Sequence, residues 1–417
     1  TGFTSFEANP NDIFSIIYTS GNTGTPKGVM LSHKNIVSQL HDINKLIDLP
    51  KGEIALSLLP LAHIFERTVM SYYLSRGISI YFVDDVLNVA NLMKIVKPTI
   101  MTVVPRLLEK IFNKIKAQIL EKPFFSRVIA SLAFSYALKE NLDKSSILFK
   151  IYDKLVYSKF REIFGSRVDK LVSGGAPLSK DIALFFVNIG VPVYQGYGMT
   201  EFSPVISTNY PNANKVGSCG KVIPSAQIKI NENNELLVRG DSLMLGYLNQ
   251  EELTKNTIDS DGWLHTGDVA YLDEDGYLFI KSRIKDIFKT STGEYVNAVE
   301  IEQKLSKNRY IEFAVVISQN RKYTTALLFV DKEKYENAKK LNKNLTIEEY
   351  YNKDDILKNI SNHINSVNSG LNKWEKIVKF KILTNDISIE TGELTPSMKI
   401  SRSKIEEKYA NIINSMY

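Results

Sequence analysis

The chain has 417 residues, a length typical of two or three domains. A hydrophobic content of 44% and a charged content of 24% exclude a largely disordered chain. The formal net charge of +6 does not suggest a nucleic-acid partner, for which a basic stripe or a known binding module would be expected. The single cysteine excludes an intrachain disulfide, and no apolar run is long enough to span a bilayer, so we expect a cytoplasmic protein.

The first half of the chain has the pattern of an α/β protein. Residues 13–20 form an apolar run typical of a buried strand, a loop rich in Gly and Thr follows at 21–28, and 31–47 has helical spacing. Strand, loop and helix in this order predict an α/β unit. Further strands, separated by helical patterns, are predicted at 78–85, 99–105, 170–175 and 191–198. These elements predict a mostly parallel sheet.

The pattern changes after about residue 208. Residues 226–240 and 275–283 alternate between apolar and polar residues and are interrupted by Gly, Asn and Asp, which predicts antiparallel hairpins. From 284 onwards, helical and strand patterns mix again. We therefore predict an α/β fold: an N-terminal domain, 1–283, with a β-rich subdomain at 208–283, and a smaller α+β C-terminal domain, 284–417.

The strongest local motif is residues 18–28, with the sequence YTSGNTGTPKG. Glycines let the backbone approach phosphate oxygens, and successive N–H groups can form an anion site, although a glycine-rich turn can also be only a turn. The motif differs from a P-loop because Gly24 is not followed directly by Lys and Ser or Thr. We predict that Lys27 adds a positive charge to a phosphate site. The other residues predicted to bind phosphate are Thr19, Ser20, Gly21, Asn22, Thr23, Gly24 and Thr25.

A second motif, YQGYGMTE at residues 194–201, places an aromatic ring, a hydroxyl group and a carboxylate at the end of a predicted strand. An aromatic ring can stack on a purine, and a carboxylate near a triphosphate can hold Mg²⁺. The simpler reading is a strand end with a solvated Glu201.

Both motifs closely resemble those of the adenylate-forming, or AMP-binding, superfamily of acyl-CoA synthetases, luciferases and peptide-synthetase adenylation domains. Asn22 stands where that superfamily usually has Ser or Thr. The resemblance implies that Lys27 and Thr200 are catalytic, that Thr200 contacts the α-phosphate, and that Glu201 binds Mg²⁺. It also implies a nucleotide site that includes Gln195, Gly196, Tyr197 and Gly198, with Tyr197 packed on adenine.

Other segments follow in the order of the same superfamily. Residues 59–63, LPLAH, resemble the motif whose histidine, here His63, lines the acyl pocket and is catalytic; on its own, His63 would be an ordinary core or surface histidine. Residues 173–177 resemble the turn along the adenine, which assigns nucleotide binding to Gly174, Gly175, Ala176 and Pro177.

Three charged residues have roles that the resemblance alone implies. Asp268, in GWLHTGD, would bind the ribose hydroxyls, since a carboxylate accepts two hydrogen bonds from a vicinal diol. Arg283 would contact the ribose, and Lys285 would be the hinge between the domains. The alternative for Arg283 and Lys285 is a solvated run of charges.

The last motif, ELTPSMK at 393–399, has Met398 where the common form has glycine. Together with 104–110 and 195–198, it resembles the long-chain acyl-CoA synthetase branch. Lys399 would be the mobile catalytic lysine of adenylation, although a lysine near a C-terminus is often only solvated. The resemblance also implies a mobile C-terminal lid domain and a sizeable segment before the phosphate loop, so part of the N-terminal domain is expected to be missing.

The expected function is ATP-dependent activation of a long-chain fatty acid to acyl-AMP, with pyrophosphate release, followed by transfer to coenzyme A. ATP, Mg²⁺, the fatty acid and coenzyme A are the expected small molecules. The alternatives are a ligase that stops at acyl-AMP or acylates a carrier protein, and a non-catalytic nucleotide- or acyl-binding relative. Oligomeric state and acyl chain length stay open.

Residues 111–165 contain ten Lys or Arg and five Asp or Glu, an excess of +5, with aromatic residues between them. Basic amphipathic helices of this kind can lie on the inner face of an anionic membrane, which is the one membrane contact that the sequence suggests. The alternative is a set of ordinary surface helices whose aromatic residues face the core.

Overall fold

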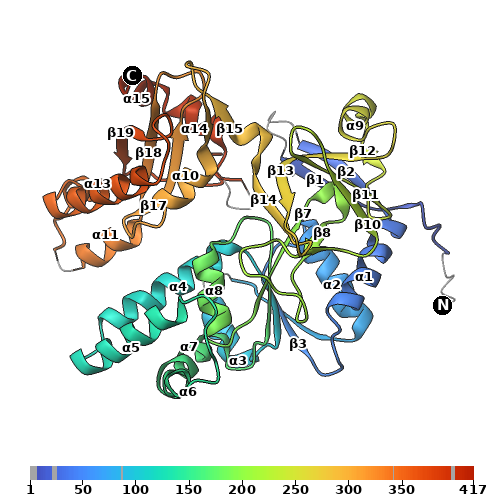
Figure 1. The fold of residues 1–417 in the computed structure, drawn as a ribbon, viewed down its shortest axis with the longest axis horizontal. Helices are drawn as coiled ribbons and strands as arrows, with labels where there is room; N and C mark the ends of the chain where they lie inside the picture. The colour runs from blue at the N-terminus through green and yellow to red at the C-terminus, as the bar shows by residue number, and fades with distance from the viewer. Residues whose placement is uncertain (1–6, 21–25, 86–87, 341, 396–399) are drawn as a thin grey trace. The chain divides into compact units, whose positions relative to one another are not determined.

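The computed structural model of the chain describes residues 7–20, 26–85, 88–340, 342–395 and 400–417 (Figure 1). Contacts between Cα atoms divide the chain into two compact units. The first unit contains residues 1–266 and 270–280, and the second contains 267–269 and 281–417. The predicted fold class is confirmed: a large, partly parallel sheet is combined with antiparallel sheets and a C-terminal α+β domain.

The first unit is built on a seven-stranded sheet with the order β4-β3-β5-β6-β7-β8-β9. The pairs from β4 to β7 are parallel, and β8 and β9 are added antiparallel at one edge. All four residues of β5 are buried, as expected for a strand inside a parallel sheet. The strands are β3 (Ile54–Ser57), β4 (Ser79–Phe82), β5 (Ile100–Val103), β6 (Lys170–Ser173), β7 (Val193–Gly198), β8 (Val205–Thr208) and β9 (Lys221–Val222).

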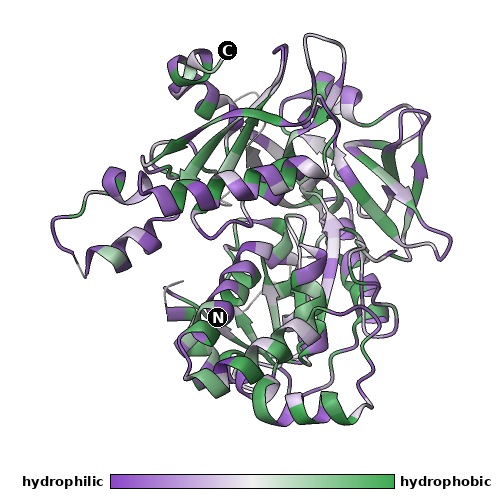
Figure 2. Cartoon of the chain, turned by 60° about the vertical axis from the view of Figure 1, so that its left-hand side comes forward, coloured by the Kyte–Doolittle hydropathy of each residue, from purple (hydrophilic) through white to green (hydrophobic). Residues whose placement is uncertain are grey.

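Helices connect the parallel strands and bury one face each against this unit's core. The start of α1 is fixed by a capping box between Ser32 and Asn35, and Pro105 suits the first turn of α4 because its φ is already helical. In Figure 2 the strands are mostly hydrophobic, whereas hydrophobic and hydrophilic residues alternate along the helices. The helices are α1 (His33–Leu46), α2 (Ile64–Arg76), α3 (Val89–Val96), α4 (Pro105–Leu120), α5 (Phe124–Ala137), α6 (Ile147–Tyr152), α7 (Ser158–Arg161) and α8 (Lys180–Asn188), with the π-helical turn η2 (Asp153–Tyr157) between α6 and α7.

The strand predicted at 13–20 and the helix predicted at 31–47 are both present, but the single loop predicted between them is wrong. β1 (Ile13–Ser20) instead pairs antiparallel with a second strand, β2 (Pro26–Ser32), and α1 begins only after it. Gly28 is closely packed in this pairing, since a Cβ there would lie 3.1 Å from a methyl carbon of Ile16. β2 also pairs with β12 (Gly246–Tyr247), so the phosphate motif lies on a three-stranded antiparallel sheet.

The predicted antiparallel hairpins after residue 208 are confirmed for the first pair of strands. β10 (Ala226–Ile230) pairs antiparallel with β11 (Glu235–Gly240). These strands belong to a four-stranded sheet that continues with β13 (Leu264–Leu272) and β14 (Leu278–Arg283). The short helix α9 (Glu251–Thr257) follows β12.

The second unit has its own hydrophobic core. In its three-stranded sheet, β17 (Ile311–Ile317) and β18 (Thr324–Val330) are antiparallel, and β19 (Ile377–Leu383) is parallel to β18. All seven residues of β18 are buried. The remaining elements are the strands β15 (Ile287–Lys289) and β16 (Tyr295–Asn297) and the helices α10 (Ala298–Leu305), α11 (Lys332–Lys339), α12 (Ile347–Tyr351), α13 (Asp354–Ser369), α14 (Arg402–Lys408) and α15 (Ala410–Ser415). In the described part of the chain, no helix is long and apolar enough to cross a membrane.

A buried carboxyl group joins α2 to the main sheet. Glu66 is 1% exposed and accepts hydrogen bonds from the hydroxyls of Ser57 and Thr102, at the ends of β3 and β5. Burial raises the pKa of Glu66 above its usual value of 4.5, although the two hydrogen bonds oppose this shift. The folded protein therefore holds this proton to a higher pH than the unfolded chain does.

We expect Glu66→Gln to remove one source of pH-dependent instability. Because the folded-state pKa is raised, the stabilisation linked to protonation is complete below pH 4.5 and decreases as the pH rises through the folded-state pKa. The free energy of unfolding is measured with urea at a series of pH values. As the pH rises from 4.5 through the folded-state pKa of Glu66, the free energy of unfolding of the wild type should fall relative to that of Glu66→Gln. Glu121→Gln, at an exposed carboxylate, is the control, and parallel curves for wild type and Glu66→Gln would contradict the assignment.

Candidate active site

Two predicted nucleotide segments lie next to each other at the carboxyl ends of parallel strands. Ser173, the last residue of β6, pairs with Gln195 of β7. Gly174–Pro177 follows β6 directly, and Gln195–Gly198 forms the end of β7. In open α/β sheets, ligands bind outside the carboxyl ends of the strands. The structure therefore brings these two segments together where a ligand is expected.

The same strand ends hold buried polar atoms that a ligand could satisfy. Among the described residues, Oγ of Ser173 and Oε1 of Gln195 are buried and have no hydrogen-bond partner. Buried polar groups in native proteins nearly always have a partner. Two such atoms on paired residues of neighbouring strands therefore mark a position for a polar ligand group.

Close packing explains the glycines of these segments. A Cβ on Gly198 would lie 2.0 Å from the carbonyl oxygen of Pro204, and a Cβ on Gly196 would lie 3.2 Å from that of Ser207. Gly174 is packed against a side chain instead, since its Cβ would lie 3.2 Å from the ring of Phe65. The turn of Gly175, Ala176 and Pro177 is exposed, and Tyr197 is half-buried.

A three-residue cluster links the phosphate motif to the end of β7. The hydroxyl of Tyr247 donates a hydrogen bond of 2.8 Å to Oε1 of Glu201, and Nζ of Lys27 lies 5.3 Å from the centre of the Tyr247 ring. Burial, and then the charge of Glu201, raises the pKa of Tyr247, so this hydroxyl stays protonated and can donate. Lys27 and Glu201, predicted separately, are thus brought together by a residue that our sequence analysis missed.

Tyr247 has no local sequence signal for this role. It lies 46 residues after Glu201, in a two-residue strand, and reaches the phosphate motif only because it pairs with Val29 of β2. Thr200 and Glu201 belong to the short helical turn η4 (Thr200–Phe202) that follows β7, and Thr200 is half-buried.

The central part of the phosphate motif lies outside the described residues. Thr19, at the end of β1, pairs with Lys27 across the hairpin, and Ser20 pairs with Pro26. The predicted phosphate ligands Gly21, Asn22, Thr23, Gly24 and Thr25 are not among the described residues. Their assignment stays a prediction.

His63 occupies the start of α2. It is half-buried at the N-cap position. Its backbone N–H donates to the carbonyl of Pro60, and its backbone carbonyl accepts from the backbone N–H of Arg67. Phe65, two residues later, is the residue that packs on Gly174. The loop carrying His63 therefore lies close to the turn that follows β6, and its acyl-pocket role stays a prediction.

In the second unit, the two predicted ribose ligands contact each other. Nε of Arg283 donates a hydrogen bond of 2.9 Å to Oδ1 of Asp268. The Asp268 side chain is 4% exposed and that of Arg283 is 57% exposed, so the guanidinium neutralises a buried carboxylate. Lys285, the predicted hinge, is exposed in the short turn η5 (Ile284–Asp286).

The last motif, 393–399, begins with a buried carboxylate, that of Glu393. Glu393 accepts hydrogen bonds from Lys408 and Thr391. Burial alone would raise the pKa of Glu393, but these hydrogen bonds lower this pKa to about 2. The pair of Glu393 with Lys408 is therefore charged at neutral pH. Leu394 and Ile400 form a bridge across the motif. Lys399 itself lies outside the described residues.

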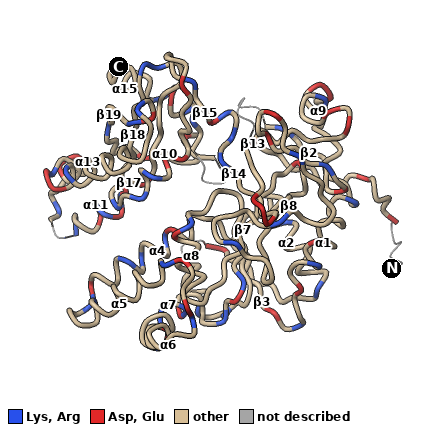
Figure 3. The backbone as a smooth tube through the Cα atoms, viewed as in Figure 1, with Lys and Arg blue, Asp and Glu red and all other residues tan. Residues whose placement is uncertain are grey.

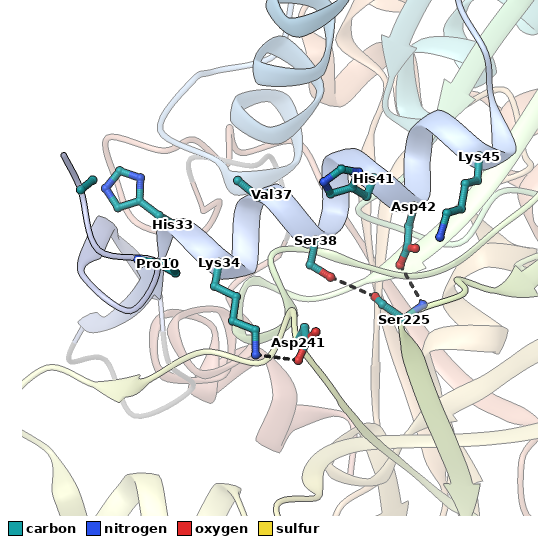
Figure 4. A pocket seen from close by; sticks show the side chains of 11 residues that line it. Pro10, His33, Lys34, Val37, Ser38, His41, Asp42, Lys45, Ser225 and Asp241 are labelled. Carbon is teal, nitrogen blue, oxygen red and sulfur yellow. Dashed lines mark hydrogen bonds and ion pairs between the residues drawn. The ribbon is translucent and has the colours of Figure 1, made fainter. Parts of the chain in front are cut away.

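A cavity of about 490 Å³ lies elsewhere in the first unit, along α1 (Figure 4). None of the predicted nucleotide residues lines it. Three of its charged groups are already satisfied by the protein, because Lys34 pairs with Asp241 at 2.9 Å and Asp42 accepts from the backbone N–H of Ser225. Among the described residues, no group of three or more His, Cys, Asp or Glu could hold a metal ion.

Two family models match the chain. The model described as AMP-binding enzyme matches residues 3–248, and the model described as AMP-binding enzyme C-terminal domain matches residues 285–417. One model matches most of the first unit and the other most of the second, and residues 249–284 lie outside both.

Curated relatives agree with these models. The Long-chain-fatty-acid--CoA ligase FadD15 of Mycobacterium tuberculosis is 32% identical over 97% of this chain, which spans 69% of that relative. The Long-chain-fatty-acid--CoA ligase ACSBG2 of Xenopus laevis is 33% identical over 98% of this chain, which spans 61% of it.

Solved structures show the same fold at lower identity. The adenylation domain of a carboxylate reductase from Mycobacterium chelonae has a TM-score of 0.75 at 23% identity, covering 98% of this chain and 60% of that one. O-succinylbenzoate coenzyme A synthetase from Bacillus subtilis, in complex with AMP, has a TM-score of 0.67 at 21% identity, covering 96% of this chain and 70% of that one.

Proposed function

Because the chain belongs to the AMP-binding enzyme family, we propose that it activates a long-chain fatty acid with ATP and transfers the acyl group to coenzyme A. The observation that carries this proposal is the similarity, at 32–33% identity over nearly the whole chain, to relatives named long-chain fatty acid–CoA ligases. The proposed enzyme is an acid–thiol ligase that forms AMP.

The first unit supplies the groups proposed to hold the adenine and the phosphates of ATP. The buried polar atoms of Ser173 and Gln195 would meet polar groups of the nucleotide, with the half-buried ring of Tyr197 stacked on adenine. Thr200 would contact the α-phosphate, and Lys27 would pair with phosphate oxygens. For the ribose, we propose Asp268, whose second oxygen and remaining lone pairs can accept from hydroxyls while Arg283 holds the first.

Glu201 is suited to bind Mg²⁺. Its carboxylate accepts the Tyr247 hydroxyl at Oε1 and has lone pairs for a hard cation as well. Bound Mg²⁺ would supply charge neutralisation on the triphosphate. Tyr247 would orient this carboxylate and, through its ring, keep the ammonium of Lys27 nearby.

The proposed chemistry needs positioning rather than a general base. A carboxylate oxygen of the fatty acid attacks the α-phosphate in line, the bond to pyrophosphate breaks, and acyl-AMP forms. Since the carboxylate is already ionised, no proton has to be removed. The thiol sulfur of coenzyme A then attacks the acyl carbon, loses its proton, and AMP leaves. Lys399 would stabilise charge in the first step, and Lys285 would allow the C-terminal domain to change position between the steps.

The test is fatty-acid-dependent release of pyrophosphate from ATP by the whole chain, with and without coenzyme A. Release with palmitate, increased by coenzyme A and accompanied by palmitoyl-CoA, is the expected result. Release without any thioester product would favour a ligase that stops at acyl-AMP or needs a carrier protein. ATP binding without release by a folded chain would favour a non-catalytic relative.

A further inference from the structure

Helix α5 presents an apolar face to solvent. Its exposed apolar residues recur at spacings of one, four, five and eight, which places them on one side of the helix. Phe125 is 82% exposed and Phe124 is 63% exposed, values that are unusual for phenylalanine. The opposite side of α5, which includes Ala133 and Phe134, is buried in the core. The exposed residues of this face are Phe124, Phe125, Val128, Ile129 and Leu132.

The continuous helical segment of α6 and η2 repeats this arrangement. Its exposed apolar residues are Ile147, Leu148, Ile151 and Leu155, and Ile147 is 78% exposed. The segment packs on α5 through its other side, where the buried Tyr157 donates a hydrogen bond of 2.8 Å to the carbonyl of Ala133. Both apolar faces therefore belong to one packed group of helices, which we call the α5–α6 surface.

Basic residues accompany these apolar faces. Lys122 precedes α5, and the guanidinium of Arg127 lies 5.8 Å from the ring centre of Phe124. Lys150 and Lys154 are exposed on α6 and η2. Figure 3 shows Lys and Arg along this region.

The five acidic residues of 111–165 offset half of its ten basic residues, and two of them are held in ion pairs. Asp153 pairs with Arg161 at 2.5 Å, and Glu140 pairs with Lys180 at 2.5 Å. A net charge of +5 remains in 111–165 after all five acidic residues are counted, and Lys122, Arg127, Lys150 and Lys154 are the part of it that accompanies the two apolar faces.

We propose that the α5–α6 surface docks on the surface of an anionic lipid bilayer. Helices with an apolar face and accompanying Lys and Arg lie in the interface, with apolar side chains among the acyl chains and the cations at the headgroups. A bilayer also requires no shape complementarity of the kind that a protein partner requires. The charge selects anionic lipid, since a zwitterionic surface has no net negative potential to attract Lys122, Arg127, Lys150 and Lys154.

The experiment measures co-sedimentation of the whole chain with vesicles. One set is phosphatidylcholine alone, and in the other about a third of the lipid is phosphatidylglycerol. We expect binding to the anionic set that weakens with salt. Lys150→Glu with Lys154→Glu should weaken it at least about twentyfold, from about fivefold for each basic residue lost. Phe125→Ser with Ile147→Ser should weaken it about tenfold or more.

Matched controls carry the same substitutions elsewhere on the first unit: Lys45→Glu with Lys51→Glu, and Leu74→Ser with Ile95→Ser, all at exposed residues. The proposal is overturned if the wild type does not bind anionic vesicles, binds both vesicle types equally, or loses binding as strongly in the controls. A dimer in sedimentation that Phe125→Ser with Ile147→Ser abolishes, without vesicle binding, would assign the surface to a second copy instead. Because vesicle binding needs neither ATP nor acyl transfer, failure here leaves the proposed ligase activity untouched.

Discussion

Lys399→Ala is expected to lower the rate of acyl-AMP formation by about 10² to 10³-fold. In the proposed mechanism, its ammonium group bridges the attacking carboxylate and the α-phosphate oxygens as negative charge develops between them. Alanine removes this stabilisation without changing the phosphate motif of the first unit. Palmitate-dependent pyrophosphate release measures the loss directly.

The second half-reaction separates this role from general damage. With palmitoyl-AMP and coenzyme A supplied, Lys399→Ala should form palmitoyl-CoA at nearly the wild-type rate, since the α-phosphate bond is already made. Lys404→Ala is the matched control, because the side chain of Lys404 in α14 is 58% exposed and, among the described residues, pairs with Glu407 at 2.9 Å. Equal loss of both half-reactions in Lys399→Ala would remove Lys399 from the adenylation step.

The parallel part of the fold was predictable because its strands are compact apolar runs ended by Gly or Pro. Residues 99–105, 170–175 and 191–198 each contain an observed strand, β5, β6 or β7. β3 (Ile54–Ser57) was not predicted, although its length of four residues is the same as that of β5 and β6. β2 (Pro26–Ser32) was missed because its first residues belong to the loop rich in Gly and Thr at 21–28 and its last residues to the helical pattern at 31–47.

The site was predictable where a motif contains its own chemistry, and not where tertiary contact creates it. Gln195–Gly198 and Gly174–Pro177 are recognisable in the sequence, and their meeting follows from the order of parallel strands. The link from Glu201 through Tyr247 to Lys27 depends on the pairing of β12 with β2, and no local sequence pattern predicts this pairing. The pairing of Arg283 with Asp268 likewise appears only in the structure.

Glu201→Gln is expected to reduce pyrophosphate release by about 10²-fold at fixed ATP and Mg²⁺. Glutamine keeps the volume and can still accept the Tyr247 hydroxyl through its carbonyl oxygen, so the fold should be preserved. It lacks the negative charge that a hard cation requires. A series of Mg²⁺ concentrations should therefore show a large increase in the concentration needed for half-maximal rate.

Tyr247→Phe distinguishes a metal ligand from a merely structural carboxylate. This change removes only the hydroxyl that donates to Oε1 of Glu201, while the ring beside Lys27 stays in place. Loss of one hydrogen bond to a charged group corresponds to about 1.5–3 kcal/mol, and part of this is recovered when the cation itself orients the carboxylate. We expect a rise of about three- to tenfold in the half-maximal Mg²⁺ concentration, with a nearly unchanged rate at saturating Mg²⁺. If Tyr247→Phe lowers the saturated rate as much as Glu201→Gln does, the hydroxyl acts on the reacting groups themselves and not through the metal ligand.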